Sequence, residues 1–314
     1  MTRRLPRYPV YIISKGRADT ILLHTAGYLA FDYVPFRVVI EPQDFDDYAQ
    51  MIPEDRILVL PFSNLGKGGT PARNWVWEHS IKEGHERHWI LDDNIRRIYR
   101  LYGGHRFPCD AAVAMRTVED FTDRYENIAI SGMNYKMFGT PNLYPYFINT
   151  HVYSNLLIRN DLPFRWRLRL NEDTDLCLVA LSRGLCTVLV NVFLADKLPT
   201  MTMKGGNTQE LYGGKWDRSE AAATDGRLDM ARILEHWHPG VVRVDRRFQR
   251  PQHVIDWKRF KQPLIRKGDE SDWQLLPELD EYGLTLRQVG QVKSERMREM
   301  VAEYEAGRAV AAAT

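Results

Sequence analysis

The sequence of 314 residues has no apolar run long enough to cross a membrane and contains only three cysteines. A transmembrane helix needs about 20 consecutive apolar residues, and the opening MTRRLPRYPVYIIS is also too short in its apolar part for a signal peptide. Cys109, Cys177 and Cys186 do not have the spacing of a zinc site or of a disulfide framework. These absences indicate a reducing compartment, so we expect a soluble protein of the cytoplasm.

The glycine-rich loops that bind nucleotide phosphates in many enzymes are missing as well. There is no G-x-G-x-x-G, and GKGGT at residues 66–70 does not have the spacing of a Walker A loop. This argues against a nicotinamide dehydrogenase and against a P-loop kinase. A nucleotide bound here would need another means of neutralising its diphosphate, and a divalent ion held by a few carboxylates is the obvious one.

What the sequence does contain is a regular alternation of apolar strands and helices over its first hundred residues. With 44% hydrophobic residues the chain can bury a large core, as one large domain or two tightly joined ones. The predicted strands are YPVYIIS (8–14), VPFRVVIE (34–41), RILVLP (56–61) and RHWIL (87–91). The intervening helices lie around residues 20–29, 42–51 and 70–84, the last capped by Thr70. This pattern is typical of a parallel α/β sheet, in which ligands bind beyond the carboxyl ends of the strands.

Two acidic clusters stand out. HWILDDN (88–94) ends a predicted strand in Asp92 and Asp93, whose repulsion can be relieved either by a helix that begins at Asn94 or by a bound divalent cation. NEDTD places Glu172, Asp173 and Asp175 at the start of a predicted helix. They either suit the helix dipole or supply a general base, and the residues alone leave both alternatives open.

A family resemblance gives these clusters a meaning. The stretch TPARNWVWEHSIKEGHERHWILDDN resembles the nucleotide-sugar half of GT-A fold glycosyltransferases, with the later ED-x-D helix on the acceptor side. More narrowly, the chain resembles the TET-associated glycosyltransferases of bacteriophages over roughly residues 8–265. The motifs that carry this resemblance are ISKGR, LGKGGTPARN, WILDDNI, NEDTDLCL, GGNT and QHVIDWKRF.

The resemblance implies a domain organisation and an activity. The fold would be a GT-A-like, mostly parallel α/β sheet flanked by helices in one large domain, residues 1–265, with a helical extension over 266–314. Residues 8–110 would form the nucleotide-sugar half and 111–265 the acceptor half. The family is implied to transfer a sugar from a UDP-sugar to 5-hydroxymethylcytosine in phage DNA, after a TET-like dioxygenase has made the hydroxymethyl group.

The resemblance also implies roles for individual residues. The donor-side residues are Ser14, Lys15 and Arg17 at the uridine and diphosphate, Glu41 at the uracil or ribose, Arg73 and Asn74 as pocket supports, and Asp92 at the ribose or sugar.

The metal and the base are implied in the same way. Asp93 and Asn94 belong to the metal motif for Mn²⁺ or Mg²⁺, with His253 as a further candidate ligand or diphosphate contact. The family motif is D-x-D, and Asn94 departs from it because an amide oxygen can ligate a cation but carries no charge. Asp173, with Glu172 beside it, is the candidate base for an inverting transfer.

The charge distribution bears on the expected DNA acceptor. The net charge of the chain is only +2, yet residues 95–108 hold four arginines and no acid, and residues 241–270 hold nine basic against four acidic residues, a local excess of +5. The alternation of Arg165, Arg167 and Arg169 in RWRLR predicts a strand with one basic face. Nearby aromatic residues, including Tyr99, Tyr102 and Trp166, could stack a base.

Other functions fit parts of the pattern. A metal-dependent nuclease or nucleotidyltransferase also uses clustered carboxylates, although it does not need the SKGR, EP and ARN elements. A protein or small-molecule acceptor would use the same donor site. A binding module that kept the fold without the chemistry would account for Asn94, but not for the intact Glu172–Asp173 pair.

Overall fold

The structure is a computed structural model that describes residues 4–199, 202–206, 227–247 and 250–268. Residues Met1–Lys267 form one compact unit, and Gly268–Thr314 form a second. Beyond residue 268, the predicted helical extension over 266–314 lies outside the described residues, and so does most of the loop expected over 200–220. The domain boundaries therefore stay predictions, and the elements named below all belong to the first unit.

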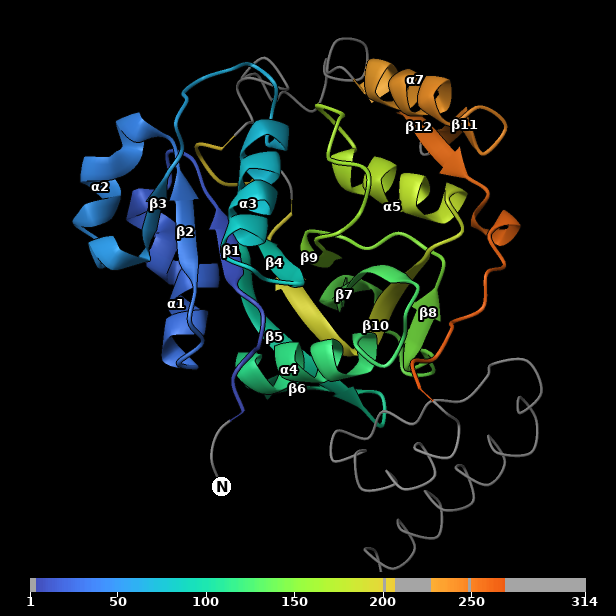
Figure 1. The fold of residues 1–314 in the computed structure, drawn as a ribbon, viewed down its shortest axis with the longest axis horizontal. Helices are drawn as coiled ribbons and strands as arrows, with labels where there is room; N and C mark the ends of the chain where they lie inside the picture. The colour runs from blue at the N-terminus through green and yellow to red at the C-terminus, as the bar shows by residue number, and fades with distance from the viewer. Residues whose placement is uncertain (1–3, 200–201, 207–226, 248–249, 269–314) are drawn as a thin grey trace, which may run out of the picture. The chain divides into compact units, whose positions relative to one another are not determined.

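A sheet of ten strands forms the centre of this unit, and its first half is parallel as predicted (Figure 1). Four strands run side by side in the order β3-β2-β1-β4. They are β1 (Val10–Ile13), β2 (Arg37–Ile40), β3 (Ile57–Val59) and β4 (Arg87–Asp92). β1 and β4 are almost completely buried, as expected for strands covered on both faces, and the apolar centre of β4 lies between Arg87 and His88 at one end and Asp92 at the other.

The second half of the sheet is mixed. The order continues β9-β7-β10-β5-β6, with β8 also paired to β10, and only β7 and β10 run parallel to each other. These strands are β5 (Ile95–Tyr102), β6 (His105–Cys109), β7 (Ile128–Tyr135), β8 (Tyr146–Ile148), β9 (Asn155–Arg159) and β10 (Cys186–Lys197). The predicted α/β class is confirmed. The alternative of a helix that begins at Asn94 is wrong, because β5 begins at Ile95.

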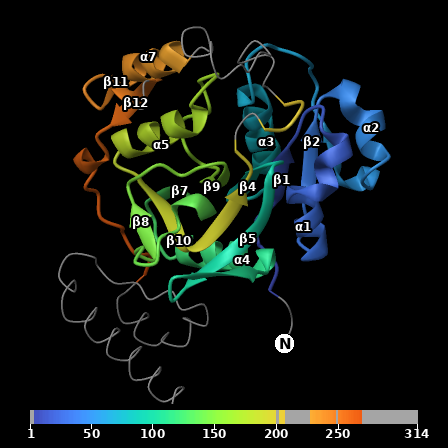
Figure 2. The same ribbon diagram turned by 180° about the vertical axis from the view of Figure 1, so that it is seen from behind.

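Helices cover both faces of the sheet (Figures 1 and 2). Ile90 of β4 packs in the core formed with α3 and α5, whereas its neighbour Trp89 donates from Nε1 to Glu119 of α4 at 2.9 Å. Successive strand residues point to opposite faces, so α3 and α4 lie on opposite sides. The helices are α1 (Thr25–Phe31), α2 (Phe45–Ala49), α3 (Thr70–Lys82), α4 (Ala111–Thr122), α5 (Glu172–Ser182) and α7 (Arg227–Trp237).

Short elements complete the described chain. A hairpin of β11 (Val242–Arg247) and β12 (Arg250–Ile255) contacts α7. Single-turn or short 3₁₀ helices span Ala18–Leu23, Pro42–Asp44, Glu54–Arg56, Lys136–Phe138 and Trp257–Arg259. Two of the predicted helices, around 20–29 and 42–51, are thus each divided into a 3₁₀ part and an α part.

Two further predictions about local structure are wrong. RWRLR is not a strand, because its residues lie in an irregular segment whose backbone is held by α3: Thr70 Oγ1 donates to the Leu168 carbonyl. The second wrong prediction concerns Thr70, which is the first residue of α3 and not its cap; the cap is Gly69. The basic side chains of this segment are engaged, since Arg165 pairs with Glu78 at 2.7 Å.

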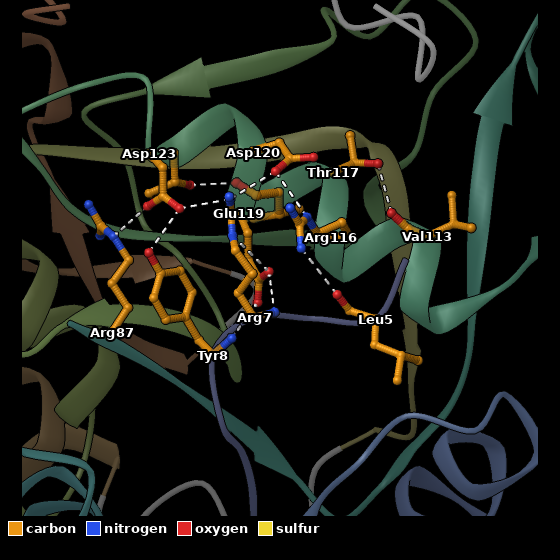
Figure 3. Close-up of polar contacts among 12 residues, drawn as sticks. Leu5, Arg7, Tyr8, Arg87, Val113, Arg116, Thr117, Glu119, Asp120 and Asp123 are labelled. Carbon is orange, nitrogen blue, oxygen red and sulfur yellow. Dashed lines mark hydrogen bonds and ion pairs between the residues drawn. The ribbon is translucent and has the colours of Figure 1, made fainter. Parts of the chain in front are cut away.

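The segment before β1 is fixed to α4 by a cluster of charged groups (Figure 3). Arg7 Nη2 donates to Asp120 and to Asp123, both at 2.8 Å. The Tyr8 hydroxyl and Arg87 Nε also donate to Asp123, at 2.9 and 3.1 Å. Because Arg87 begins β4, this cluster joins the amino-terminal ends of β1 and β4.

Candidate active site

At the carboxyl ends of the same strands, the SKGR loop after β1 meets the acidic turn after β4. Asp93 is only 4% exposed. Its carboxylate accepts hydrogen bonds from Ser14 Oγ at 2.7 Å and from Arg17 Nη1 at 2.6 Å. The Ser14 hydroxyl also contacts Tyr48 at 2.5 Å. Ser14, Arg17 and Asp93 are therefore brought together at this edge of the sheet.

Asp92 is held by two different cations. Arg73 Nη2 lies 3.0 Å from its Oδ1, and Lys197 Nζ lies 3.3 Å from its Oδ2. Burial works against ionisation of Asp92, but Lys197 and Arg73 outweigh it and lower the pKa. For Asp93, burial prevails over Arg17 and the pKa is raised. Lys197 at the end of β10 was not predicted, since no local pattern distinguishes it from any lysine that ends a strand.

Glu41 follows β2 and forms the outer part of the site. Lys15 Nζ is 3.0 Å from Glu41 Oε2, which also accepts from Gln43 at 2.6 Å and from the backbone N–H of Asn64 at 3.2 Å. Burial works to raise the pKa of Glu41, but the hydrogen bonds from Gln43 and Lys15 outweigh it and the pKa is lowered. Glu41 is thus a carboxylate that accepts hydrogen bonds, the chemistry expected for contact with a ribose or uracil.

The first glycines of the GGNT motif pack against the SKGR loop. Gly206 donates its N–H to the Lys15 carbonyl at 2.8 Å, and Arg17 Nε donates to the Lys204 carbonyl at 2.9 Å. Gly205 has φ +73, and a Cβ there would lie 2.3 Å from the Gly16 oxygen. Only glycine satisfies both this backbone conformation and this close approach.

The two polar residues of the ARN motif have different positions: Arg73 lies in the site, and Asn74 supports the neighbouring backbone. Arg73, 7% exposed, lies over the Trp166 ring at 4.9 Å, and its Nε is 3.5 Å from Glu172 Oε1. Asn74 instead exchanges two hydrogen bonds with the backbone of Trp166, at 2.8 and 3.0 Å. It supports the pocket by fixing the residue on which Arg73 packs. Trp166 is 2% exposed, so the prediction that it stacks a base is wrong.

The three acids at the start of α5 have different surroundings. Asp175 is 1% exposed and is held by Arg167 through two bonds of 2.8 Å and by His238 at 2.7 Å, which is a structural role. For Glu172, burial raises the pKa to about 7, with Arg73 opposing the rise. The pKa of Asp173 is lowered instead.

Asp173 is paired with a histidine that the sequence did not reveal. His151 Nε2 lies 3.2 Å from Asp173 Oδ2. Although burial works to raise the pKa of Asp173, His151 outweighs it and the pKa is lowered. Burial lowers the pKa of His253 in β12, and His151 lowers it further. No motif marks His151, which reaches α5 from the segment between β8 and β9.

The predicted metal ligands are brought together only in part. Asn94 is 8% exposed, and its Oδ1 is a buried acceptor without a hydrogen-bond partner, next in the chain to Asp93. An orphaned amide oxygen beside a carboxylate fits a hard cation that takes its other ligands from substrate phosphates. No group of three or more His, Cys, Asp or Glu in the described part of the chain is arranged for a metal, and His253 therefore belongs to none.

Carboxylates and cations gather after β1, β2 and β4 of an α/β sheet, and the acidic start of α5 pairs with them through Arg73. This arrangement matches the GT-A-like glycosyltransferase fold. The model of the TET-Associated Glycosyltransferase family matches residues 8–206, so the chain belongs to this family and is a glycosyltransferase. Comparison with curated proteins gave no match. Among the described residues, none of the helices has the length and apolar character required to traverse a bilayer.

Proposed function

We propose that the protein transfers a sugar from a UDP-sugar to the hydroxymethyl group of 5-hydroxymethylcytosine in DNA, with a divalent ion at Asp93 and Asn94. The observation that carries the acceptor assignment is the position of the β11–β12 hairpin. Val242 of β11 shares a buried apolar cluster with Leu178 of α5, the helix whose first turn carries Asp173, so a strand pair rich in arginine packs beside the acidic start of α5. A TET-like dioxygenase is the class of enzyme that would supply the hydroxymethyl group.

The donor would bind at the carboxyl ends of the strands. Arg17, Arg73 and Lys197 are cations that already face carboxylates there, and Arg73 Nη1 is buried without a hydrogen-bond partner. A buried guanidinium with an unused donor is suited to a phosphate oxygen. A bound Mn²⁺ or Mg²⁺ would neutralise charge that develops on the leaving diphosphate.

The acceptor DNA would approach over the hairpin. Arg243 and Arg246 of β11 are exposed, and Arg247 and Arg250 pair across the end of the hairpin in its backbone register. Exposed arginines on a strand pair can contact successive phosphates. The hydroxymethyl group of a duplex lies in the major groove, so the enzyme reads from that side or turns the base out.

Mass spectrometry of nucleosides tests the transfer directly. Hydroxymethylated DNA, unmodified DNA and a panel of UDP-sugars would be incubated with the enzyme, and a sugar-modified nucleoside is expected only from hydroxymethylated DNA. Absence of any such product would contradict the DNA acceptor. The same UDP-sugar panel with protein and small-molecule acceptors would then identify the alternative.

The salt dependence of DNA binding tests whether the β11–β12 hairpin contacts the DNA. Replacing Arg246, Arg247 and Arg250 by alanine should weaken DNA binding and reduce the slope of log affinity against log salt by up to about 0.9 for each phosphate that is no longer neutralised. Fluorescence anisotropy at several salt concentrations measures both. Unchanged affinity and slope in the triple variant would remove this hairpin from the DNA path.

The metal is tested by Asp93→Ala. Without this carboxylate the cation would lose its only charged ligand in the Asp93–Asn94 pair, so we expect Mn²⁺ no longer to enhance UDP binding in calorimetry. Asn94→Asp is the matched variant and should tighten Mn²⁺ binding, because it adds a charge. UDP binding with unchanged Mn²⁺ dependence in Asp93→Ala would place the ion elsewhere.

A further inference from the structure

His151 lies between β8 and β9, at the start of α5. Its Nε2 is 3.2 Å from Asp173 Oδ2 and 3.2 Å from Thr174 Oγ1. The imidazole is nearly parallel to the Trp257 ring, at 8° and 6.2 Å between centroids, and is inclined against Tyr153 at 4.5 Å. Two aromatic rings and two polar contacts therefore fix the orientation of this histidine.

Asp173 is poorly suited to take a proton itself. Its Oδ1 accepts from the Thr174 N–H at 2.7 Å and from the Thr174 hydroxyl at 3.3 Å, while Oδ2 faces His151. Burial works to raise the pKa of Asp173, but His151 and Thr174 outweigh it and hold the pKa well below its usual range. A carboxylate whose ionised form is stabilised in this way has little tendency to accept a proton.

The contact with Asp173 also selects a tautomer of His151. An ionised carboxylate can only accept, so the imidazole hydrogen lies on Nε2 and Nδ1 is left with a free lone pair. Nδ1 has no hydrogen-bond partner among the described residues, and the His151 side chain is 21% exposed. The basic nitrogen is thus the one that is open to a substrate.

Resting on the proposed sugar transfer, we propose that His151, oriented by Asp173, accepts the proton of the acceptor hydroxyl. The hydroxyl oxygen forms a bond to the anomeric carbon as the bond from that carbon to the diphosphate oxygen breaks. The electron pair leaves with the nucleoside diphosphate, and the hydroxyl proton passes to Nδ1. Asp173 stabilises the imidazolium, solvent later removes the proton, and the anomeric centre is inverted.

Three titratable groups face His151. They are Asp173 from α5, His253 from β12 and Tyr153 two residues along the same segment. Burial lowers the pKa of His253, and His151 lowers it further. Burial raises the pKa of Tyr153, so its hydroxyl stays neutral. Asp173 is the acidic partner of His151 among these groups.

The kinetic test uses His151→Gln and His151→Ala. We expect kcat for transfer to fall about 10²–10⁴-fold in both, with KM for UDP-sugar and DNA within a few-fold of wild type. The pH dependence of kcat should differ between the wild type and His151→Gln, because glutamine cannot take up the proton of the acceptor hydroxyl. Added imidazole should restore part of the activity of His151→Ala.

His85→Gln is the matched control. His85 precedes β4 at the opposite end of that strand from the site, and the variant should keep the wild-type profile. A His151→Gln enzyme that keeps the wild-type pH dependence, or transfers within a few-fold of wild type, would overturn the proposal.

Nitrogen NMR of ¹⁵N-histidine-labelled protein supplies a readout that does not depend on the acceptor. His151 should be in the Nε2–H tautomer in the wild type and should lose that preference in Asp173→Asn, whereas an Nδ1–H tautomer would overturn the proposal. If the wild type transfers no sugar to hydroxymethylated DNA, the acceptor assignment fails. The tautomer and the pH profile of UDP-sugar hydrolysis would still decide the role of His151.

Discussion

Two clusters of charged residues lie at opposite ends of β1 and β4, and they differ in whether their polar atoms have partners. At the amino-terminal ends, no side-chain atom of Arg87, Glu119 or Asp123 is buried without a hydrogen bond (Figure 3). At the carboxyl ends, Arg73 Nη1 and Asn94 Oδ1 are buried and unpartnered. Because such atoms cost free energy unless a ligand satisfies them, the first cluster stabilises the fold and the second is suited to bind.

The largest effect is expected from Arg73→Met. Arg73 and Arg87 are both buried arginines, 7% and 3% exposed, but only Arg73 belongs to the unsatisfied cluster. Loss of a buried charged partner costs about 2–5 kcal/mol of binding, so UDP affinity should fall at least about 30-fold in calorimetry. Arg87→Met is the control and should bind UDP as wild type does. Equal losses of UDP affinity in the two variants would remove the distinction between the clusters.

The second effect concerns stability. Asp123→Ala removes the common acceptor of Arg7, Tyr8 and Arg87, and leaves the Arg87 guanidinium buried without its carboxylate. We expect the free energy of unfolding in denaturant to fall by about 3 kcal/mol, the lower end for a broken buried pair because Asp123 is partly solvated.

The matched control for that variant is Asp120→Ala, whose partners Arg7 and Arg116 are 39% and 20% exposed in their side chains. This change should cost under about 1 kcal/mol. In both variants the folded protein should bind UDP normally. A loss of UDP affinity in Asp123→Ala would show that the two ends of the strands are coupled.

The smallest effect is a pH dependence of donor binding. Burial raises the pKa of Glu172 to about 7, so this carboxyl is neutral below that pH and charged above it. A charged Glu172 competes with the diphosphate for Arg73, and UDP affinity should therefore fall a few-fold as pH rises from 6 to about 8. Glu172→Gln should abolish the slope, and a slope unchanged in this variant would assign the titration to another group.

The parts of the site that the sequence predicted are those that follow a strand directly. Ser14, Glu41 and Asp93 each come just after an apolar run, and the parallel strands carry them to one edge. His151 and Lys197 reach the same region through strand pairings that are distant in the sequence, and nothing in their local pattern indicates this.

The error over RWRLR has a related cause. Alternating arginines are typical of a strand, but a strand also needs a neighbour to pair with its backbone. In this segment the backbone groups of Trp166 and Leu168 are bonded instead to Asn74 and Thr70, which are side chains of α3. Local alternation cannot reveal that competition.

The β11–β12 hairpin has a consequence for how this enzyme could diversify. The family match ends at residue 206, whereas His253 and Trp257, which face His151, lie beyond it. In the proposed reaction, the donor site and the residues that act on the acceptor hydroxyl therefore lie in the matched stretch, whereas the hairpin that would contact the acceptor DNA lies in the stretch that follows it. Under the proposed function, exchange of the later stretch could redirect the enzyme to a new acceptor while its sugar-transfer chemistry is inherited intact.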